Sequence, residues 1–323
     1  MRLSRLLQIA VVAACGLFSV AALAAYPDRP IKLIAPYPPG GTTDILARAI
    51  ADKLSQALGQ PVIVENRDGA GGVVGHNLVA KATPDGYTLV LGNSAMLAVS
   101  VSLLPDLPYN PTKDFAPITE AAAGPLVLDV KPSLPVHSVA DLIALAKSEP
   151  KKLNAGLAAT GSMHHMVTDQ IKAKTGVEWT DVPYKGSAPM LLDLLGGQID
   201  FGFDNIPSSL PYIKADRLRA LAVTSPTRTS LLPDVPTLKE AGVAGVEALA
   251  WHGVLAPAGT PEAIVNRLHD EVVKIIKSPE MKARLAELGL EPVGSSPAEF
   301  AQFIRDENVK WAKTAKEANV KLQ

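Results

Sequence analysis

Two glycines and two threonines lie between a short apolar run and a helical pattern near the start of the chain, and this combination suits anion binding. Gly40 and Gly41 lack a Cβ atom, so the backbone of this turn can approach a ligand closely. Thr42 and Thr43 are both suitable N-caps for the helix that follows. The first N–H groups of a helix prefer a negative charge. We therefore predict that this turn binds a carboxylate; the alternative is that the glycines only make a tight strand-to-helix turn.

A second turn of small residues occurs in the middle of the chain. The apolar run 153–157 leads into Ala-Ala-Thr-Gly-Ser at 158–162, and a helical pattern follows with Ser162 as a suitable N-cap. Ligands of open α/β sheets bind beyond the carboxyl ends of the strands. Two such turns, one in each half of the chain, could place backbone donors on opposite sides of one anion.

Three further strand ends carry polar side chains. Asn93 and Ser94 follow an apolar run, so their amide and hydroxyl could reach a ligand. Lys185 is the one basic side chain in these turns, with an ordinary exposed lysine as the alternative. Asp204 could accept a hydrogen bond from a ligand hydroxyl, an ammonium group or a bound water, and the alternative is a solvated aspartate at a strand end.

The same stretches lack the patterns of metal, cofactor or covalent chemistry. Adjacent His164 and His165 face about 100° apart on a helix and belong to no H-E-x-x-H motif, so we predict no metal, although one imidazole could line the site. Residues 66–72 are glycine-rich but are not G-x-G-x-x-G, and no acidic residue follows at dinucleotide spacing. Residues 92–96 are not the G-x-S-x-G elbow. No catalytic residue and no cofactor are predicted.

The first 25 residues have the features of a secretory leader. Arg2 and Arg5 precede the apolar run 6–24, which ends in Ala-Leu-Ala at 22–24, a small-residue cleavage signal. A transmembrane anchor is the first alternative, but no stop-transfer pattern follows. Lipid attachment at Cys15 is the second. We predict export to the periplasm.

Charge and composition exclude several classes of partner. Cys15 is the only cysteine, so the exported chain can form no disulfide. The 31 basic residues include two in the leader, so 29 remain against 32 acidic residues. This slightly acidic balance argues against nucleic acid, and it means that local dipoles rather than the overall field must attract an anion. An aromatic content of 5% disfavours a stacking platform for sugars or bases.

From residue 30 onward, strand patterns alternate with helix patterns, which predicts an α/β fold with a mainly parallel sheet covered on both faces. The expected strands are 31–35, 62–65, 87–91, 153–157, 179–183, 199–203, 219–223 and 249–255. The expected helices are 44–58, 73–82, 138–148, 162–175, 187–195, 261–277, 279–288 and 297–319.

Two proline-rich segments, 105–125 and 226–236, interrupt this alternation. We interpret each as a crossing between two lobes, with a ligand cleft and hinge closure between them. The resulting lobes are 26–115 with 226–296, and 116–225, while the C-terminal helical segment 297–323 is assigned to neither.

Together these segments closely resemble the Bug-type (TctC-like) extracytoplasmic solute receptors of tripartite tricarboxylate transporters, over essentially the whole mature chain. The matching segments are YPDRPIKLIAPYPPGGTTDILAR (26–48), GQPVIVENRDGAGG (59–72), PDGYTLVLGNS (84–94), ATGSMHH (159–165), PYKGSAPMLLDLLGGQIDFGF (183–203), LPDVPTLKEAG (232–242) and APAGTP (256–261). So many ordered segments make a chance match implausible.

The resemblance implies a type II periplasmic binding fold that closes on a small carboxylate through main-chain N–H groups and bridging waters. Tyr37 stands where this family commonly has Phe. The ligand-binding residues that the resemblance implies are Tyr37, Pro39, Gly40, Gly41, Thr42, Asp44, Asn93, Ser94, Ala159, Thr160, Gly161, Ser162, His164, Tyr184, Lys185, Gly186 and Asp204.

We therefore expect a monomeric receptor for a mono-, di- or tricarboxylate, with acidic amino acids and aromatic acids as further candidates. Its partners would be two membrane transporter subunits or a sensor protein, for uptake or sensing, and the family also contains receptors without an evident transporter. The alternative is a secreted hydrolase or oxidoreductase that uses the same cleft.

Overall fold

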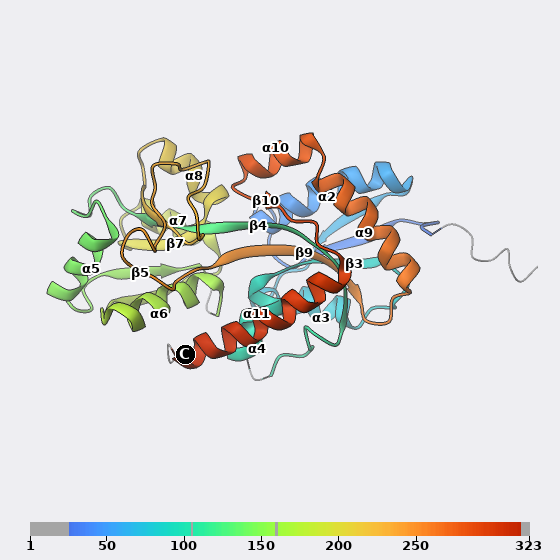
Figure 1. Ribbon diagram of the computed structural model, residues 1–323, viewed down its shortest axis with the longest axis horizontal. Coiled ribbons are helices and arrows are strands. Elements are labelled where there is room, and N and C mark those ends of the chain that lie inside the picture. The colour runs from blue at the N-terminus through green and yellow to red at the C-terminus, as the bar shows by residue number, and fades with distance from the viewer. Residues whose placement is uncertain (1–25, 105, 159–160, 318–323) are drawn as a thin grey trace, which may run out of the picture.

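A computed structural model of the 323-residue chain describes residues 26–104, 106–158 and 161–317 (Figure 1). The expected leader, Cys15, Ala159 and Thr160 lie outside these ranges. Within them, no helix combines the length and the apolar character that a membrane span requires.

One mixed sheet runs through the molecule. Its strands, in spatial order, are β2 (Val62–Asn66), β1 (Ile31–Ala35), β3 (Thr88–Asn93), β9 (Leu249–Pro257), β4 (Phe115–Val130), β7 (Phe201–Asn205), β5 (Asn154–Leu157) and β6 (Thr180–Pro183), with β8 (Arg219–Val223) and β10 (Glu291–Pro292) also paired to β4. Pairing is parallel at both ends, where β1 joins β2 and β3, and β5 joins β6 and β7. The two middle strands are antiparallel to their neighbours. The prediction of a mainly parallel α/β fold is confirmed for the two ends.

Helices cover the sheet at both ends (Figure 1). They are α2 (Thr42–Leu58), α3 (Val73–Ala80), α4 (Ser100–Leu103), α5 (Val139–Ser148), α6 (Met163–Thr175), α7 (Ser187–Leu195), α8 (Ile206–Lys214), α9 (Glu262–Ile276), α10 (Pro279–Glu287) and α11 (Pro297–Glu317), with a 3₁₀ turn η1 (Ala70–Gly72) and a π turn η2 (Ala95–Val99). Ser138 caps α5, since its Oγ accepts from the N–H of Asp141 at 3.1 Å, and the helix expected at 138–148 is confirmed. The apolar stripe of α2, with Leu46 and Ile50 fully buried, packs on the inner strands of the first end.

Strands β4 and β9 connect the two ends (Figure 1). β4 pairs with β9 from Phe115 to Pro125, then with β7 from Leu126 to Val130 and with β8 from Val127 to Val130, so the first expected crossing ends in a continuous 16-residue strand. The second crossing is not at 226–236. That segment stays beside β8, where the N–H of Val223 donates to the carbonyl of Pro236 at 2.9 Å, and the chain returns only at β9. Its prolines are typical of an irregular loop, but their pattern does not indicate against which end of the sheet the loop packs.

Helix α11 lies across the middle of the sheet and contacts both ends (Figure 1). Asn308 Nδ2 donates to the carbonyl of Leu97 at 2.8 Å, whereas Gln170 Nε2 of α6 donates to Thr314 Oγ1 at 3.4 Å. The carboxylate of Glu307, on a residue only 7% exposed, accepts the indole N–H of Trp251 at 3.2 Å and that of Trp311 at 2.8 Å. Both indoles belong to fully buried side chains.

We expect Glu307→Leu to lower the melting temperature by roughly 5–10 °C, because two buried indole N–H groups lose their acceptor at about 1–3 kcal/mol each. Differential scanning calorimetry measures the change. Glu317→Leu, at an exposed position of the same helix, is the control and should leave the melting temperature nearly unchanged. Equal effects of the two substitutions would contradict this role of Glu307.

Candidate functional site

The first candidate turn begins helix α2 differently from the expectation. The N-cap is Gly41, and Thr42 and Thr43 are already helical, so the prediction that a threonine caps this helix is wrong. Gly40 has φ +87°, a left-handed conformation that favours glycine. Its N–H donates to Asp44 Oδ2 at 2.9 Å, so one of the predicted anion donors has an internal acceptor. The next N–H groups, those of the first helical turn, have no partner within the helix.

Asp44 is the centre of a network that holds this turn. Its carboxylate accepts from Arg48 Nε at 3.1 Å and from Asn66 Nδ2 at 2.9 Å, and Asn66 Nδ2 also donates to the carbonyl of Tyr37 at 3.0 Å. Burial raises the pKa of Asp44, but the hydrogen bonds from Arg48, Gly40 and Asn66 outweigh it and hold the pKa below its ordinary value. Asp44 therefore stays ionised, with its charge compensated by Arg48.

Tyr37 and Asn93 meet at the carboxyl ends of β1 and β3. The phenol oxygen lies 3.0 Å from Asn93 Nδ2, and burial raises the Tyr37 pKa to about 12, so the phenol is neutral. The glycine-rich stretch after β2 supports this pair. A Cβ atom at Gly72 would lie 3.0 Å from the phenol ring, and Gly72 has φ +110°. The glycines of residues 69–72 therefore allow a tight turn and close packing against Tyr37.

His252 is a further candidate residue, which the sequence analysis missed. It lies on β9, directly opposite Asn93 of β3, and its Nε2 is 3.2 Å from Thr43 Oγ1. The residue is 4% exposed, and burial lowers the pKa of its imidazole to about 4, so the ring is neutral. Its Nδ1 has no hydrogen-bond partner among the described residues. The available signal was one histidine within the apolar run 249–255.

At the second turn, Gly161 also donates its N–H internally, to His165 Nδ1 at 3.1 Å. The other ring nitrogen of His165 lies 3.1 Å from Asp169 Oδ2, so it carries the proton. Ser162 caps α6 as predicted, because its hydroxyl accepts from the N–H of His165 at 3.4 Å. His165, Asp169 and Asp181 offer ligand atoms within 4.8 Å of one another, but Lys172 forms ion pairs with both carboxylates and so already provides them with a cationic partner.

His164 and Asp204 lie together beside this turn. His164 Nε2 is 3.4 Å from Asn205 Nδ2 and 3.9 Å from Asp204 Oδ1, and burial lowers the His164 pKa to about 4. Asp204 is fully buried, so the alternative of a solvated aspartate is wrong. The hydroxyl of Ser187 donates to its Oδ1, yet burial dominates and raises the Asp204 pKa to about 7.

Asp129 adds a second carboxyl group to the same face of neighbouring strands. Asp129 lies on β4 and pairs with Gly202 of β7, whereas Val127, two residues earlier on β4, pairs with Asp204. Alternate residues of a strand share a face, so the carboxyl groups of Asp129 and Asp204 project from the same face. Asp129 is fully buried, and among the described residues the hydroxyl of Ser209 is the one side-chain donor near enough to its carboxyl group to favour the charged form. Burial raises its pKa well above the ordinary value.

The remaining predicted residues lie at the edges of these groups. The hydroxyl of Tyr184 donates to Asp193 Oδ2 at 2.8 Å, so it is directed toward α7. Lys185 and Pro39 are exposed, and Ser94 is buried at the start of η2. Gly186 precedes α7 with φ +144°. The structure thus brings Tyr37 to Asn93 on one side of β4 and β9, and His164 to Asp204 on the other.

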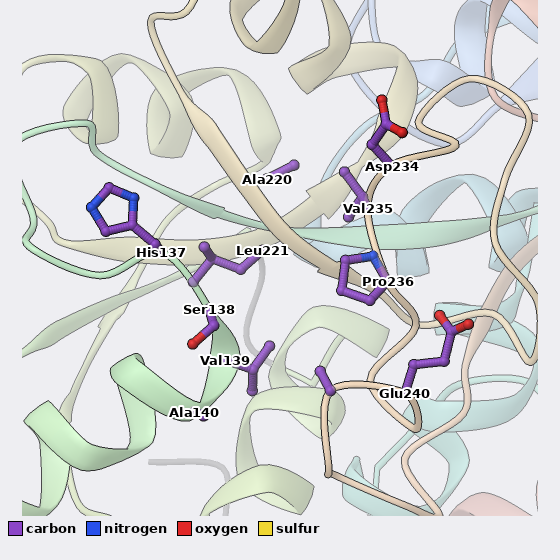
Figure 2. A pocket seen from close by; sticks show the side chains of 11 residues that line it. His137, Ser138, Val139, Ala140, Ala220, Leu221, Asp234, Val235, Pro236 and Glu240 are labelled. Carbon is purple, nitrogen blue, oxygen red and sulfur yellow. The ribbon is translucent and has the colours of Figure 1, made fainter.

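A separate cavity of about 460 Å³ lies between the start of α5 and the loop after β8 (Figure 2). None of the predicted ligand residues lines it. The Glu240 carboxylate at its edge already accepts the N–H of Thr237 at 2.8 Å and pairs with Arg228 at 2.9 Å. The N–H of His137 likewise donates to Asp141 at 2.9 Å. These polar groups have protein partners, so the cavity gives no evidence of a ligand.

The Thr43–His252 contact has the atoms of a nucleophile and a base, but not their full arrangement. Such a pair needs a third group that orients the imidazole through its other nitrogen. The part of the chain that the structure describes provides none at His252 Nδ1. The site can therefore offer neutral donors and acceptors to a ligand, which suits binding.

Comparison with known proteins shows close relatives over almost the whole chain. Protein BugT of Bordetella pertussis is 40% identical over 326 residues, covering 100% of both chains. The structure titled "R. palustris Rpa4515 with adipate" has 42% identity and a TM-score of 0.88, covering 92% of this chain and 99% of that one. MatC from Rhodopseudomonas palustris with bound malate has 33% identity and a TM-score of 0.83, covering 90% and 99%.

These relatives include periplasmic binding proteins, which agrees with the two-lobed α/β architecture; one is BugD, with 33% identity and a TM-score of 0.85 over 92% of this chain and 100% of that one. The family model described as "Tripartite tricarboxylate transporter family receptor" (TctC) matches residues 46–320. The chain therefore belongs to the TctC family of tripartite tricarboxylate transporter receptors.

Proposed function

We propose that this protein is a periplasmic receptor that binds a small carboxylate between its two lobes and catalyses no reaction. The observation that carries the proposal is its 42% identity, over 92% of the chain, to R. palustris Rpa4515, whose structure was solved with adipate. A second relative, at 33% identity, has a solved structure with bound malate. Both ligands are dicarboxylates, so we favour this class.

The geometry of the two turns supports carboxylate binding. The first N–H groups of α2 and α6 lack helical partners and lie at the carboxyl ends of β1 and β5. Because Gly40 and Gly161 donate their N–H groups to Asp44 and His165, we assign anion binding to the amide of Gly41 and to the first helical amides of α2 and α6. The neighbouring phenol and imidazoles are neutral, so they can donate or accept without bringing a charge.

We infer that β4 and β9 form the hinge between the lobes, since they connect the two ends of the sheet. The assignment of individual residues to lobes stays a prediction. We also propose that residues 1–25 are a cleaved leader. Two membrane subunits or a sensor protein would receive the ligand from a monomeric receptor, as in the transport systems after which the family is named.

A thermal-shift screen of the mature protein tests the proposal. Protein freed of co-purified ligand by unfolding and refolding should melt at a higher temperature with adipate or malate, because a ligand that binds only the native state stabilises it by about 2.7 kcal/mol at 100 times its Kd. Sulfate at equal ionic strength is the control.

Two outcomes would contradict the proposal. One is the absence of any shift across mono-, di- and tricarboxylates, acidic amino acids and aromatic acids. The other is conversion of a bound carboxylate to a new product, followed by mass spectrometry, since it would favour an enzyme.

A further inference from the structure

His252 stands in a row of polar side chains at the ligand edge of the first lobe. Strands β1, β3 and β9 are neighbours; Tyr37 follows the end of β1, Asn93 ends β3, and His252 pairs with Asn93 from within β9. Directly paired residues of antiparallel strands project from the same face, so Asn93 and His252 face the same side. That side is the one covered by α2, since Thr43 in its first turn contacts His252.

The imidazole is held at one nitrogen and lacks a partner at the other. Thr43 Oγ1 lies 3.2 Å from Nε2, which fixes the ring. Nδ1 is buried, on a residue that is 4% exposed, and has no partner in the described ranges of the chain. A buried polar atom without a hydrogen bond is rare in native proteins and destabilising, so a partner from outside the chain is the economical explanation.

We propose, resting on the carboxylate-receptor function above, that His252 Nδ1–H donates a hydrogen bond to the carboxylate bound at the N-terminus of α2. The Thr43 hydroxyl then donates to Nε2 and fixes the tautomer. Thr43 acts through His252 and is a positioning residue. The arrangement adds a side-chain donor to the backbone donors of the turn and brings no competing charge. It also places a ligand contact on a hinge strand, so that binding and lobe closure involve the same element.

Two amide substitutions separate the nitrogens of the ring. The amide nitrogen of asparagine occupies roughly the place of Nδ1, whereas the longer glutamine reaches the place of Nε2. We expect His252→Asn to bind adipate and malate within about threefold of the unchanged protein, and His252→Gln to bind at least about tenfold more weakly, as for a lost hydrogen bond to a charged group. Isothermal titration calorimetry measures both affinities, and His269→Gln on α9 is the matched control, expected to have no effect.

A second measurement does not depend on the variants. In the adipate complex, ¹⁵N NMR of the histidine rings should show the His252 proton on Nδ1 and a changed Nδ1 shift relative to the free protein. A His252 proton on Nε2 in the complex would overturn the proposal. So would a His252→Gln protein that folds and binds both ligands as tightly as the unchanged protein, or equal weakening by the two amides.

Thr43→Val tests the positioning role. It should weaken adipate binding in the unchanged background but have little effect in the His252→Asn background, because asparagine does not reach Thr43. Equal weakening in both backgrounds would contradict a role through His252. If the unchanged protein binds neither adipate nor malate nor any other carboxylate, the proposed function itself fails. If the unchanged protein and every His252 variant bind these ligands equally well, only the role of His252 fails.

Discussion

Replacing Gly41 by proline should weaken carboxylate binding by about 10- to 100-fold, because it removes a backbone donor from the turn before α2. The substitution suits this position. Gly41 has φ −80°, close to the value that proline imposes, and the nearest atom to an added Cβ is the carbonyl oxygen of Pro38 at 3.9 Å. No hydrogen bond of the Gly41 N–H is found in the described structure, so folding loses none.

Gly41→Ala is the matched control, because alanine keeps the N–H and fits the same φ and the same space. It should bind adipate within about threefold of the unchanged protein, and Lys185→Ala should do the same, since that side chain is exposed. Isothermal titration calorimetry gives the affinities and melting curves report folding. Equal weakening by alanine and proline would contradict the backbone-donor explanation, as would a larger effect of Lys185→Ala.

The two candidate glycines, which the sequence presents as equivalent, differ in the structure. Gly161 has φ +73°, a conformation closed to proline, and its N–H already donates to His165. A proline there would disturb the turn and the His165–Asp169 pair, so it could not isolate a ligand contact. The difference depends on a side chain four residues further along the helix, and residue types alone do not reveal which acceptor an N–H will find.

Local patterns predicted most elements because the causes of those elements are local. The apolar periodicity of α2 and the cap of α5 depend on residues within one or two turns, and both are found. Helix α8 was missed because it contains Pro207 and Pro211, which favour loops in a sequence. The return crossing was misplaced because the loop after β8 is held by hydrogen bonds to that strand.

The sequence predicted which turns make up the candidate site, but not the partners of the residues in those turns. Glycines, caps and strand-end side chains pointed to the turns, since strand–turn–helix units place them at one edge of a sheet. The partners of those residues come from distant parts of the chain. Thr43 meets His252 on β9, 209 positions away, and Asp204 is buried beneath Ser187 rather than solvated. Long-range pairing decides both, and no local spacing encodes it.

The buried carboxyl of Asp204 should make the protein less stable as the pH rises. Its pKa is about 7 in the folded protein against 3.8 ordinarily, so the folded state holds a proton that the unfolded state releases between these values. Stability from this group is therefore unchanged below about pH 4, falls as the pH rises toward 7, and stays low above it. A shift of about three pKa units corresponds to about 4 kcal/mol, or roughly 5–10 °C in melting temperature.

Asp204→Asn should remove most of this pH dependence, because an amide can still accept from Ser187 and cannot ionise. At pH 8 the variant should melt roughly 5–10 °C higher than the unchanged protein, and near pH 4 the two should coincide. Asp129 shares the same buried face, so Asp129→Asn should give part of the same effect, as expected for coupled carboxyl groups. Asp306→Asn, at an exposed position of α11, should change neither curve. Melting curves from pH 4 to 8 that remain parallel for the unchanged protein and Asp204→Asn would show that Asp204 is ionised in the fold, and that a cation or a rearranged donor compensates its charge.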